Sequence, residues 1–176
     1  TLQLSAGSHT LSTDGYLQSV ETITLNSSGT TVDFTGQTEG FTITGGGGVD
    51  VITAGSGDDI ITGAAGSDTV TTKNGVDIIL TALGDDTITV DGSGNKTIDG
   101  GAGTDTLKID VTGITNMDSF SSIHKDTSTG YLSLTTKTGD VISIKNIEKL
   151  LVNNIDYGDP SSNNPRSLQN VTGLFY

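Results

Sequence analysis

Residues 45–62 read GGGGVDVITAGSGDDIIT, which is two copies of a nine-residue unit, Gly-Gly-x-Gly-x-Asp-x-apolar-x. The unit recurs through the middle of the chain, cleanly again as GGAGTDTLK from Gly100 and more loosely in the copies between. Its apolar position is spaced by nine residues, with one step of ten, at Ile43, Ile52, Ile61, Val70, Ile79, Ile88, Ile98 and Leu107. A fixed period of this length predicts a solenoid of stacked short repeats.

Each unit divides into a strand and a turn. The segment Val51-Ile52-Thr53 is β-branched, and strand alternation turns Ile52 inward while Val51 and Thr53 face outward. The glycines before it supply left-handed backbone conformations and let the chain approach an ion closely. A three-residue strand is not stable alone, so the units must stack and pair their backbone groups in an all-β fold.

Aspartates share this register and concentrate the negative charge of the chain. Residues 45–110 carry eleven Asp against three Lys, a net charge of −8 out of a total of −13. Carboxylates stacked at strand spacing repel one another, so a compact fold requires a cation between them. Carboxylate and carbonyl oxygens suit calcium, whereas magnesium demands a tighter octahedron. The chain has no Cys, and His9 and His124 are isolated, so the sequence does not favour zinc or copper.

This repeat resembles the nonapeptide of RTX (hemolysin-type) calcium-binding proteins over roughly residues 42–110. The resemblance implies a right-handed parallel β-roll in which one unit makes half a coil and units two apart stack on the same edge. Asp50, Asp68, Asp86 and Asp105 then lie on one edge, and Asp59 and Asp77 on the other. We expect about four calcium ions, in the intervals Asp50/Asp68, Asp68/Asp86, Asp86/Asp105 and Asp59/Asp77.

The expected ligands are aspartate carboxylates and carbonyl oxygens of the turn glycines. They are Gly46, Gly48, Asp50, Gly55, Gly57, Asp59, Gly66, Asp68, Gly75, Asp77, Gly84, Asp86, Gly101, Gly103 and Asp105. Phe41 and Lys96 hold the Asp position at the two ends of the second edge. We hypothesise that the Lys96 ammonium lies against Asp77 and closes that row in place of an ion.

The flanks keep a strand rhythm without the Gly-Asp turn. Val20–Thr24 and Thr31–Phe34 predict metal-free capping coils, and Tyr131–Thr136 with Val141–Lys145 predict a β-hairpin. We expect the segment Asn146–Val152 to cover the last coil. The expected division is 1–40 (N-terminal cap), 41–110 (β-roll), 111–154 (C-terminal β flank) and 155–176 (polar tail with little regular structure).

The tail raises two further readings. Gly173–Tyr176 could belong to an uncleaved type I secretion signal, or it could simply be a loosely packed end. The Asp159-Pro160 bond resembles the cleavage point of a calcium-dependent self-cleaving module found in some RTX proteins, although nothing else in the sequence matches that module.

Composition and missing motifs narrow the functional classes. A pI of about 4.1 argues against nucleic acid or anionic membrane as a partner, because both require a basic surface. The sequence has no apolar run of about eighteen residues, and it lacks HExxH, GxSxG and P-loop motifs. We therefore predict a chain that is not an enzyme and has no transmembrane segment.

The favoured function is a calcium-dependent structural module of a secreted bacterial cell-surface protein, an S-layer protein or an adhesin. Its expected partners are calcium, the type I secretion machinery, and the cell surface or further copies in a lattice. One alternative is the C-terminal secretion and folding region of an extracellular enzyme, a protease or lipase. A minor alternative is ice binding by outward threonines, which stand at Thr53, Thr71 and Thr89 on one face and at Thr44 and Thr62 on the other. Leu80 and Asp99 interrupt the second of these ladders.

Overall fold

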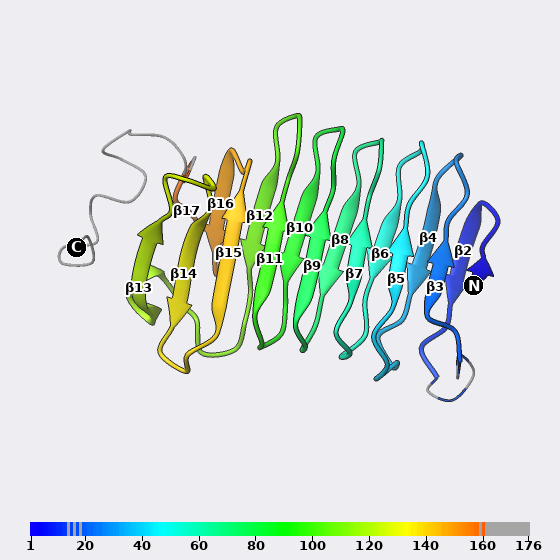
Figure 1. Cartoon of the computed structure of the whole chain (residues 1–176), viewed down its shortest axis with the longest axis horizontal. Helices are drawn as coiled ribbons and strands as arrows, with labels where there is room; N and C mark the ends of the chain where they lie inside the picture. Colours follow the sequence, from blue (N-terminus) through cyan, green and yellow to red (C-terminus); the bar gives the residue numbers. More distant parts are fainter. Residues whose placement is uncertain (14, 16, 18, 159, 161–176) are drawn as a thin grey trace.

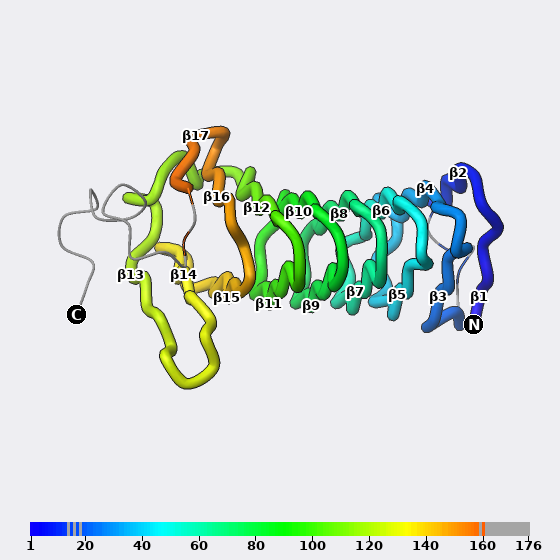
Figure 2. The backbone as a smooth tube through the Cα atoms, turned by 90° about the horizontal axis from the view of Figure 1, so that it is seen from above, coloured from blue at the N-terminus to red at the C-terminus, as the bar shows by residue number. Residues whose placement is uncertain are grey.

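The described part of the chain forms an elongated roll of short strands. The computed structural model describes residues 1–158 apart from 14, 16 and 18, together with residue 160. Two β-sheets face each other along the roll, and the coils succeed one another along its length (Figure 1). Seen from above, the backbone winds between the two sheets as a flattened spiral (Figure 2). An all-β parallel solenoid is therefore confirmed.

The first sheet has nine strands in the order β1-β3-β5-β7-β9-β11-β15-β14-β13. Their bounds are β1 (Leu2–Gln3), β3 (Thr22–Thr24), β5 (Thr42–Thr44), β7 (Ile60–Thr62), β9 (Asp77–Leu80), β11 (Lys96–Asp99), β15 (Val141–Lys145), β14 (Leu132–Thr136) and β13 (Phe120–Lys125). The order steps by two along the chain up to β11, because the intervening strands belong to the opposite sheet.

The second sheet has eight strands in the order β17-β16-β12-β10-β8-β6-β4-β2. Their bounds are β17 (Ile155–Asp156), β16 (Lys149–Val152), β12 (Thr106–Ile109), β10 (Thr87–Val90), β8 (Thr69–Thr72), β6 (Val51–Thr53), β4 (Thr30–Asp33) and β2 (Gly7–Thr10). Two successive strands, one from each sheet, make one coil, as expected from the eighteen-residue spacing of equivalent positions.

The core consists of two ladders of apolar side chains, one on the inner face of each sheet. In the first sheet Ile43 pairs with Ile61, which pairs with Ile79 and then Ile98. The second sheet stacks Ile52, Val70, Ile88 and Leu107 in the same way. All eight side chains are fully buried. Burial of each side chain stabilises the fold by about 1.5–3 kcal/mol. The core is thin because each nine-residue unit contributes one residue to these ladders.

The N-terminal flank continues the coil without the repeat motif. The predicted strands near Val20–Thr24 and Thr31–Phe34 are present as β3 and β4, which pair in parallel with β5 and β6. Two strands that the sequence did not predict, β1 and β2, pair in parallel with β3 and β4. The two sheets therefore extend past the Gly-Asp turns toward the N-terminus.

The C-terminal flank combines the predicted hairpin with one more coil. Strands β14 and β15 pair antiparallel across residues 137–140, as predicted. Strand β15 also pairs in parallel with β11, and β16 pairs in parallel with β12, so the flank adds a complete coil to the roll. A short 3-10 helix, η1 (Met117–Ser119), leads into β13.

Strand β17 lies at the start of the segment for which little regular structure was expected. The remaining expectations for the tail, at Asp159 and at residues 161–176, fall outside the described residues. Within the described part of the chain, no helix is long and apolar enough to cross a membrane.

Candidate metal centre

Two rows of aspartates run along the two edges of the roll where the turns enter the strands. The first row lies directly before the strands of the second sheet and consists of Asp50, Asp68, Asp86 and Asp105. The residues that follow these aspartates are paired, Val51 with Thr69, Thr69 with Thr87, and Thr87 with Thr106, so the aspartates are stacked in the same order. Asp59 and Asp77 stand at the equivalent place in the first sheet, where Ile60 pairs with Ile78. The structure thus brings together the stacked pairs that the sequence predicted.

One carboxylate oxygen of each aspartate is fixed by the neighbouring coil. The backbone amide of Asp50 donates to Oδ1 of Asp68 at 2.8 Å, that of Asp68 to Oδ1 of Asp86 at 2.7 Å, and that of Asp86 to Oδ1 of Asp105 at 2.9 Å. In the second row the amide of Asp59 donates to Oδ1 of Asp77 at 3.0 Å. These bonds lock each side chain inside the roll.

The second carboxylate oxygen is the unusual feature of the rows. In Asp59, Asp68, Asp86 and Asp105, Oδ2 is buried and has no hydrogen-bond partner. A buried charged oxygen without a partner is costly, because its desolvation is not compensated. In Asp50, at the N-terminal end of the first row, Oδ2 accepts the amide of Gly46 at 2.9 Å. A cation bound beside these Oδ2 atoms would therefore stabilise the rows.

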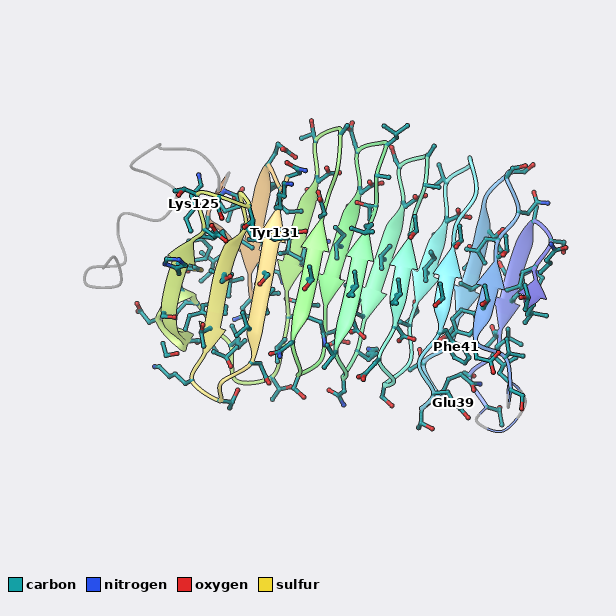
Figure 3. All side chains as sticks on the ribbon, in the orientation of Figure 1. Glu39, Phe41, Lys125 and Tyr131 are labelled. Atoms are coloured by element: carbon teal, nitrogen blue, oxygen red, sulfur yellow. The ribbon has the colours of Figure 1, made fainter. Side chains whose placement is uncertain are left out.

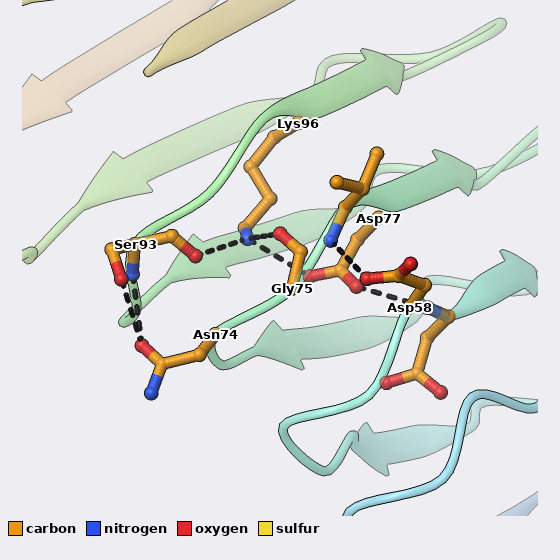
Figure 4. A network of polar contacts seen from close by, with 8 residues as sticks. Asp58, Asn74, Gly75, Asp77, Ser93 and Lys96 are labelled. Carbon is orange, nitrogen blue, oxygen red and sulfur yellow. Dashed lines mark hydrogen bonds and ion pairs between the residues drawn. The ribbon is translucent and has the colours of Figure 1, made fainter. Parts of the chain in front are cut away.

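Lys96 supplies such a cation at the C-terminal end of the second row (Figure 4). Its Nζ lies 3.1 Å from Oδ2 of Asp77, and both side chains are inaccessible to solvent. The ammonium also donates to the carbonyl oxygens of Gly75 at 2.6 Å and Ser93 at 2.9 Å. The predicted contact between Lys96 and Asp77 is therefore present, and one carboxylate and two main-chain carbonyls surround the charge.

Phe41 closes the opposite end of the same row. The Phe41 side chain, labelled in Figure 3, is buried. It packs on Phe34, with ring centroids 5.6 Å apart. Its backbone amide still donates to Oδ1 of Asp59 at 2.8 Å, so the main-chain pattern of the row persists where the carboxylate is lost. An apolar ring at one end and an ammonium at the other leave Asp59/Asp77 as the one stacked pair in this row.

Glycine is required in the turns because adjacent coils touch through their backbones. A Cβ built on Gly84 would lie 1.8 Å from the carbonyl oxygen of Gly66, and the φ angle of Gly84 is +134°. The other glycines predicted as ligands lie in the same stacked turns and face the backbone of the coil before them: Gly46, Gly48, Gly55, Gly57, Gly66, Gly75, Gly101 and Gly103. The stacking therefore leaves no room for a side chain at these positions.

The donor set fits a hard divalent cation. Among the described residues no three His, Cys, Asp or Glu side chains gather at one place. Each interval instead lies between the carboxylates of two stacked aspartates. A carboxylate oxygen and a carbonyl oxygen lie close together at Gly63. A Cβ on Gly63 would be 2.5 Å from Oδ2 of Asp68 and 2.8 Å from the carbonyl oxygen of Thr81, which belongs to the next coil. Carboxylate plus carbonyl oxygen in a flexible turn is the ligand chemistry of calcium.

The comparison with known families agrees with this chemistry. Residues 42–70 and 56–88 match the family described as the RTX calcium-binding nonapeptide repeat. The turns within residues 42–88 are RTX calcium-binding repeats. No curated protein matches the chain. The match supports Ca²⁺ as the ion of the RTX turns. The aspartate carboxylates and turn carbonyls described above are its proposed ligands.

The electrostatics of the RTX rows reflect their burial. Burial raises the pKa of Asp59 from 3.8 to about 7, and the neighbouring Asp77 adds to the effect. Burial likewise raises the pKa of Asp68 and that of Asp105 to about 6, with further contributions from the adjacent carboxylates in the row. A raised pKa means that burial disfavours the ionised carboxylate. A bound cation favours the ionised form and so opposes this effect.

Sequence reasoning missed two polar groups in these turns. Thr72 replaces the first glycine of its unit, and its Oγ1 is buried without a hydrogen-bond partner beside the Asp77 turn. Glu148 lies outside the repeats, yet its Oε2 accepts the backbone amide of Asp105 at 2.7 Å. The nine-residue motif gives no signal for either one, although the position of Glu148 directly before the strand-like Lys149–Val152 could have indicated it.

Proposed function

We propose that this chain is a calcium-dependent structural module of a secreted bacterial cell-surface protein, an S-layer protein or an adhesin. It folds on calcium binding after export by a type I secretion machinery. The observation that supports this proposal is the pair of buried carboxylate rows whose Oδ2 atoms have no hydrogen-bond partner. A fold that encloses such charge depends on an ion that is abundant outside the cell.

The proposed mechanism couples export to folding. Where calcium is scarce, Asp68 and its neighbours repel one another and the short strands have no stable coil to join. Extracellular calcium, at millimolar concentration, suits the weak affinity of extracellular calcium modules. Binding and folding are then one event, because the stacked turns exist only in the folded chain. About four ions occupy the intervals of the roll at 41–110, and the flanks at 1–40 and 111–154 cap it.

The proposed role is structural rather than catalytic. The two histidines lie on β2 and β13, at opposite ends of the roll (Figure 1), so they do not form a pair. His9 Nε2 lies 2.8 Å from the carbonyl oxygen of Ser5, and His124 is exposed. The buried carboxylates are engaged with backbone amides of the roll. These features favour a load-carrying or spacing element of a surface protein.

A calcium titration followed by circular dichroism and light scattering tests the proposal. We expect a coil-like spectrum in chelator, a β spectrum with calcium, and larger particles with calcium if the module assembles into a lattice. A chain that is equally folded in chelator and in calcium would overturn the proposed mechanism. A calcium-folded chain that stays monomeric at high concentration would favour an adhesin over an S-layer role.

One observation favours ice binding as a second candidate. Thr53, Thr71 and Thr89 are neighbours in register on the outer face of the second sheet, and Thr69, Thr87 and Thr106 form a parallel column two residues away. Lys108 ends the first column. An assay of ice recrystallisation with the calcium-loaded chain decides this candidate, since a surface module without ice affinity leaves crystal growth unchanged.

A further inference from the structure

Glu148 occupies the aspartate position of the last coil. Lys149 pairs with Thr106, so Glu148 is level with Asp105, as Asp105 is level with Asp86. The amide of Asp105 donates to Glu148 Oε2 at 2.7 Å, which reproduces the bond from the amide of Asp50 to Asp68 Oδ1 at 2.8 Å. The first carboxylate row therefore continues by one residue into the C-terminal flank.

The oxygen atoms around Gly100 match those around Gly45, the first glycine of an earlier turn. A Cβ on Gly100 would lie 2.1 Å from the carbonyl oxygen of Asn146 and 2.6 Å from Asp105 Oδ2. At Gly45 the corresponding atoms are the carbonyl oxygen of Gly63 at 2.2 Å and Asp50 Oδ2 at 2.8 Å. A carbonyl from the following coil thus faces an aspartate Oδ2 here too, although Asn146 belongs to no repeat.

The carboxylate of Asp105 has an uncompensated charge directed into this interval. Asp105 is fully buried, and its Oδ2 has no hydrogen-bond partner. Among the described residues neither Asp105 nor Glu148 forms an ion pair, and the adjacent Lys149 ammonium lies 3.6 Å from Asp156 instead. At the end of the second row, in contrast, Lys96 neutralises Asp77. The first row ends without a protein cation.

We propose that a further calcium ion binds between Asp105 and Glu148, with the Asp105 and Glu148 carboxylates and the carbonyl oxygen of Asn146 as ligands. The site lies outside the nine-residue motif, and it rests on the proposed calcium binding by the RTX rows. The ion joins the last repeat turn to the coil formed by β15 and β16. The main chain is already joined there, because the Asp105 carbonyl accepts the amides of Glu148 at 3.1 Å and Lys149 at 3.0 Å.

The chain offers a matched control for this site. Thr22 pairs with Thr42, so Glu21 is level with Phe41, at the same register position as Glu148 but beside a residue without a carboxylate. Glu148→Gln retains an oxygen that can accept the Asp105 amide and removes only the charge, so the roll should still form. Glu21→Gln makes the same chemical change at the other end of the roll.

Native mass spectrometry and calorimetric titration of the full chain with calcium alone test the proposal. We expect Glu148→Gln to hold one calcium ion fewer than the wild type, and Glu21→Gln to hold the wild-type number. A folded Glu148→Gln chain with the wild-type number of ions and unchanged affinities would overturn the assignment. A wild-type chain that binds no calcium would instead overturn the proposed function.

Anomalous diffraction from wild-type crystals grown in calcium provides a second measurement that needs no variant. We expect a peak between Asp105 and Glu148 in addition to those in the repeat intervals. Peaks in the repeat intervals without one beside Glu148 would show that the row ends at Asp105, and would leave the proposed function intact.

Discussion

The backbone amide of Asp68 donates to Oδ1 of Asp86 at 2.7 Å, while Oδ2 of each of these carboxylates is buried without a hydrogen-bond partner. One oxygen thus holds the coils in register and the other is left for an ion. In the proposed sites, one oxygen of each side chain keeps the coils in register and the other binds calcium. This division predicts how variants should behave.

Asp68→Asn tests that division, because asparagine keeps an acceptor for the amide of Asp50 but removes the charge shared by two intervals. We expect calcium affinity to fall roughly tenfold or more, since calcium sites are tuned by their number of charged ligands. In chelator the variant should be no less folded than the wild type, because row repulsion is reduced. Calorimetric titration checks the affinity. Asp110→Asn, an exposed residue outside the row, should match the wild type.

Lys96→Asp should add a calcium ion, because it replaces the internal cation by a carboxylate opposite Asp77. The carbonyl oxygens of Gly75 and Ser93 that now accept from Lys96 Nζ would become available to the metal. Native mass spectrometry in calcium should record one ion more than in the wild type, and folding should require more calcium. Lys73→Asp carries the same change of charge at a partly exposed site that pairs with Asp91. An extra ion in both variants would contradict the role of Lys96.

The calcium-free roll should become more stable as the pH falls from about 7 to about 5. The folded pKa values of Asp59, Asp68 and Asp105 are raised from 3.8 to about 7, 6 and 6. In this window the folded chain binds more protons than the unfolded chain, so its stability is lost as the pH rises through these values. Circular dichroism in chelator at several pH values measures the effect as a gain of β signal toward acid. Asp126 titrates lower, since hydrogen bonds from Ser128 and Thr129 reduce its pKa to about 2.

With calcium present the pH dependence should reverse. Protons compete with the metal for the same carboxylates, so acid should release calcium and lower the stability of the loaded roll. Urea unfolding in millimolar calcium over the same pH range checks this. Parallel trends with and without calcium would show that the buried aspartates do not bind the ion.

Ile79→Ala and Ile78→Ala compare the two faces of one strand. Ile79 is fully buried, whereas Ile78 is 39% exposed. We expect the first substitution to reduce the free energy of unfolding of the calcium-loaded chain by about 2–5 kcal/mol, because it leaves a cavity in the ladder. The second should change it by about 0.5 kcal/mol or less. Urea denaturation measures both, and equal effects would contradict the inward ladder.

The repeat itself was sufficient to predict the coils and the stacking of the aspartates along each edge. A nine-residue period with alternation around Ile52 fixes which side chains point inward, and the Gly-x-Asp spacing fixes which carboxylates stack. Even the contact between Lys96 and Asp77 follows from register, because Lys96 holds the aspartate position and pairs with Asp77 in the neighbouring strand. The flanks carry no such period, so β1, β2 and the parallel pairing of β15 with β11 were not predicted.

The sequence by itself therefore determined the roll, its inward isoleucines and the order of aspartates along each edge, because a strictly periodic chain repeats one local geometry. The tertiary structure decided where each row ends. Glu148 lies forty-three residues from Asp105 in the chain, and only the return of β16 onto β12 places the two side by side. Contacts between distant, non-repeating segments depend on how the intervening hairpin packs, and no local pattern records that.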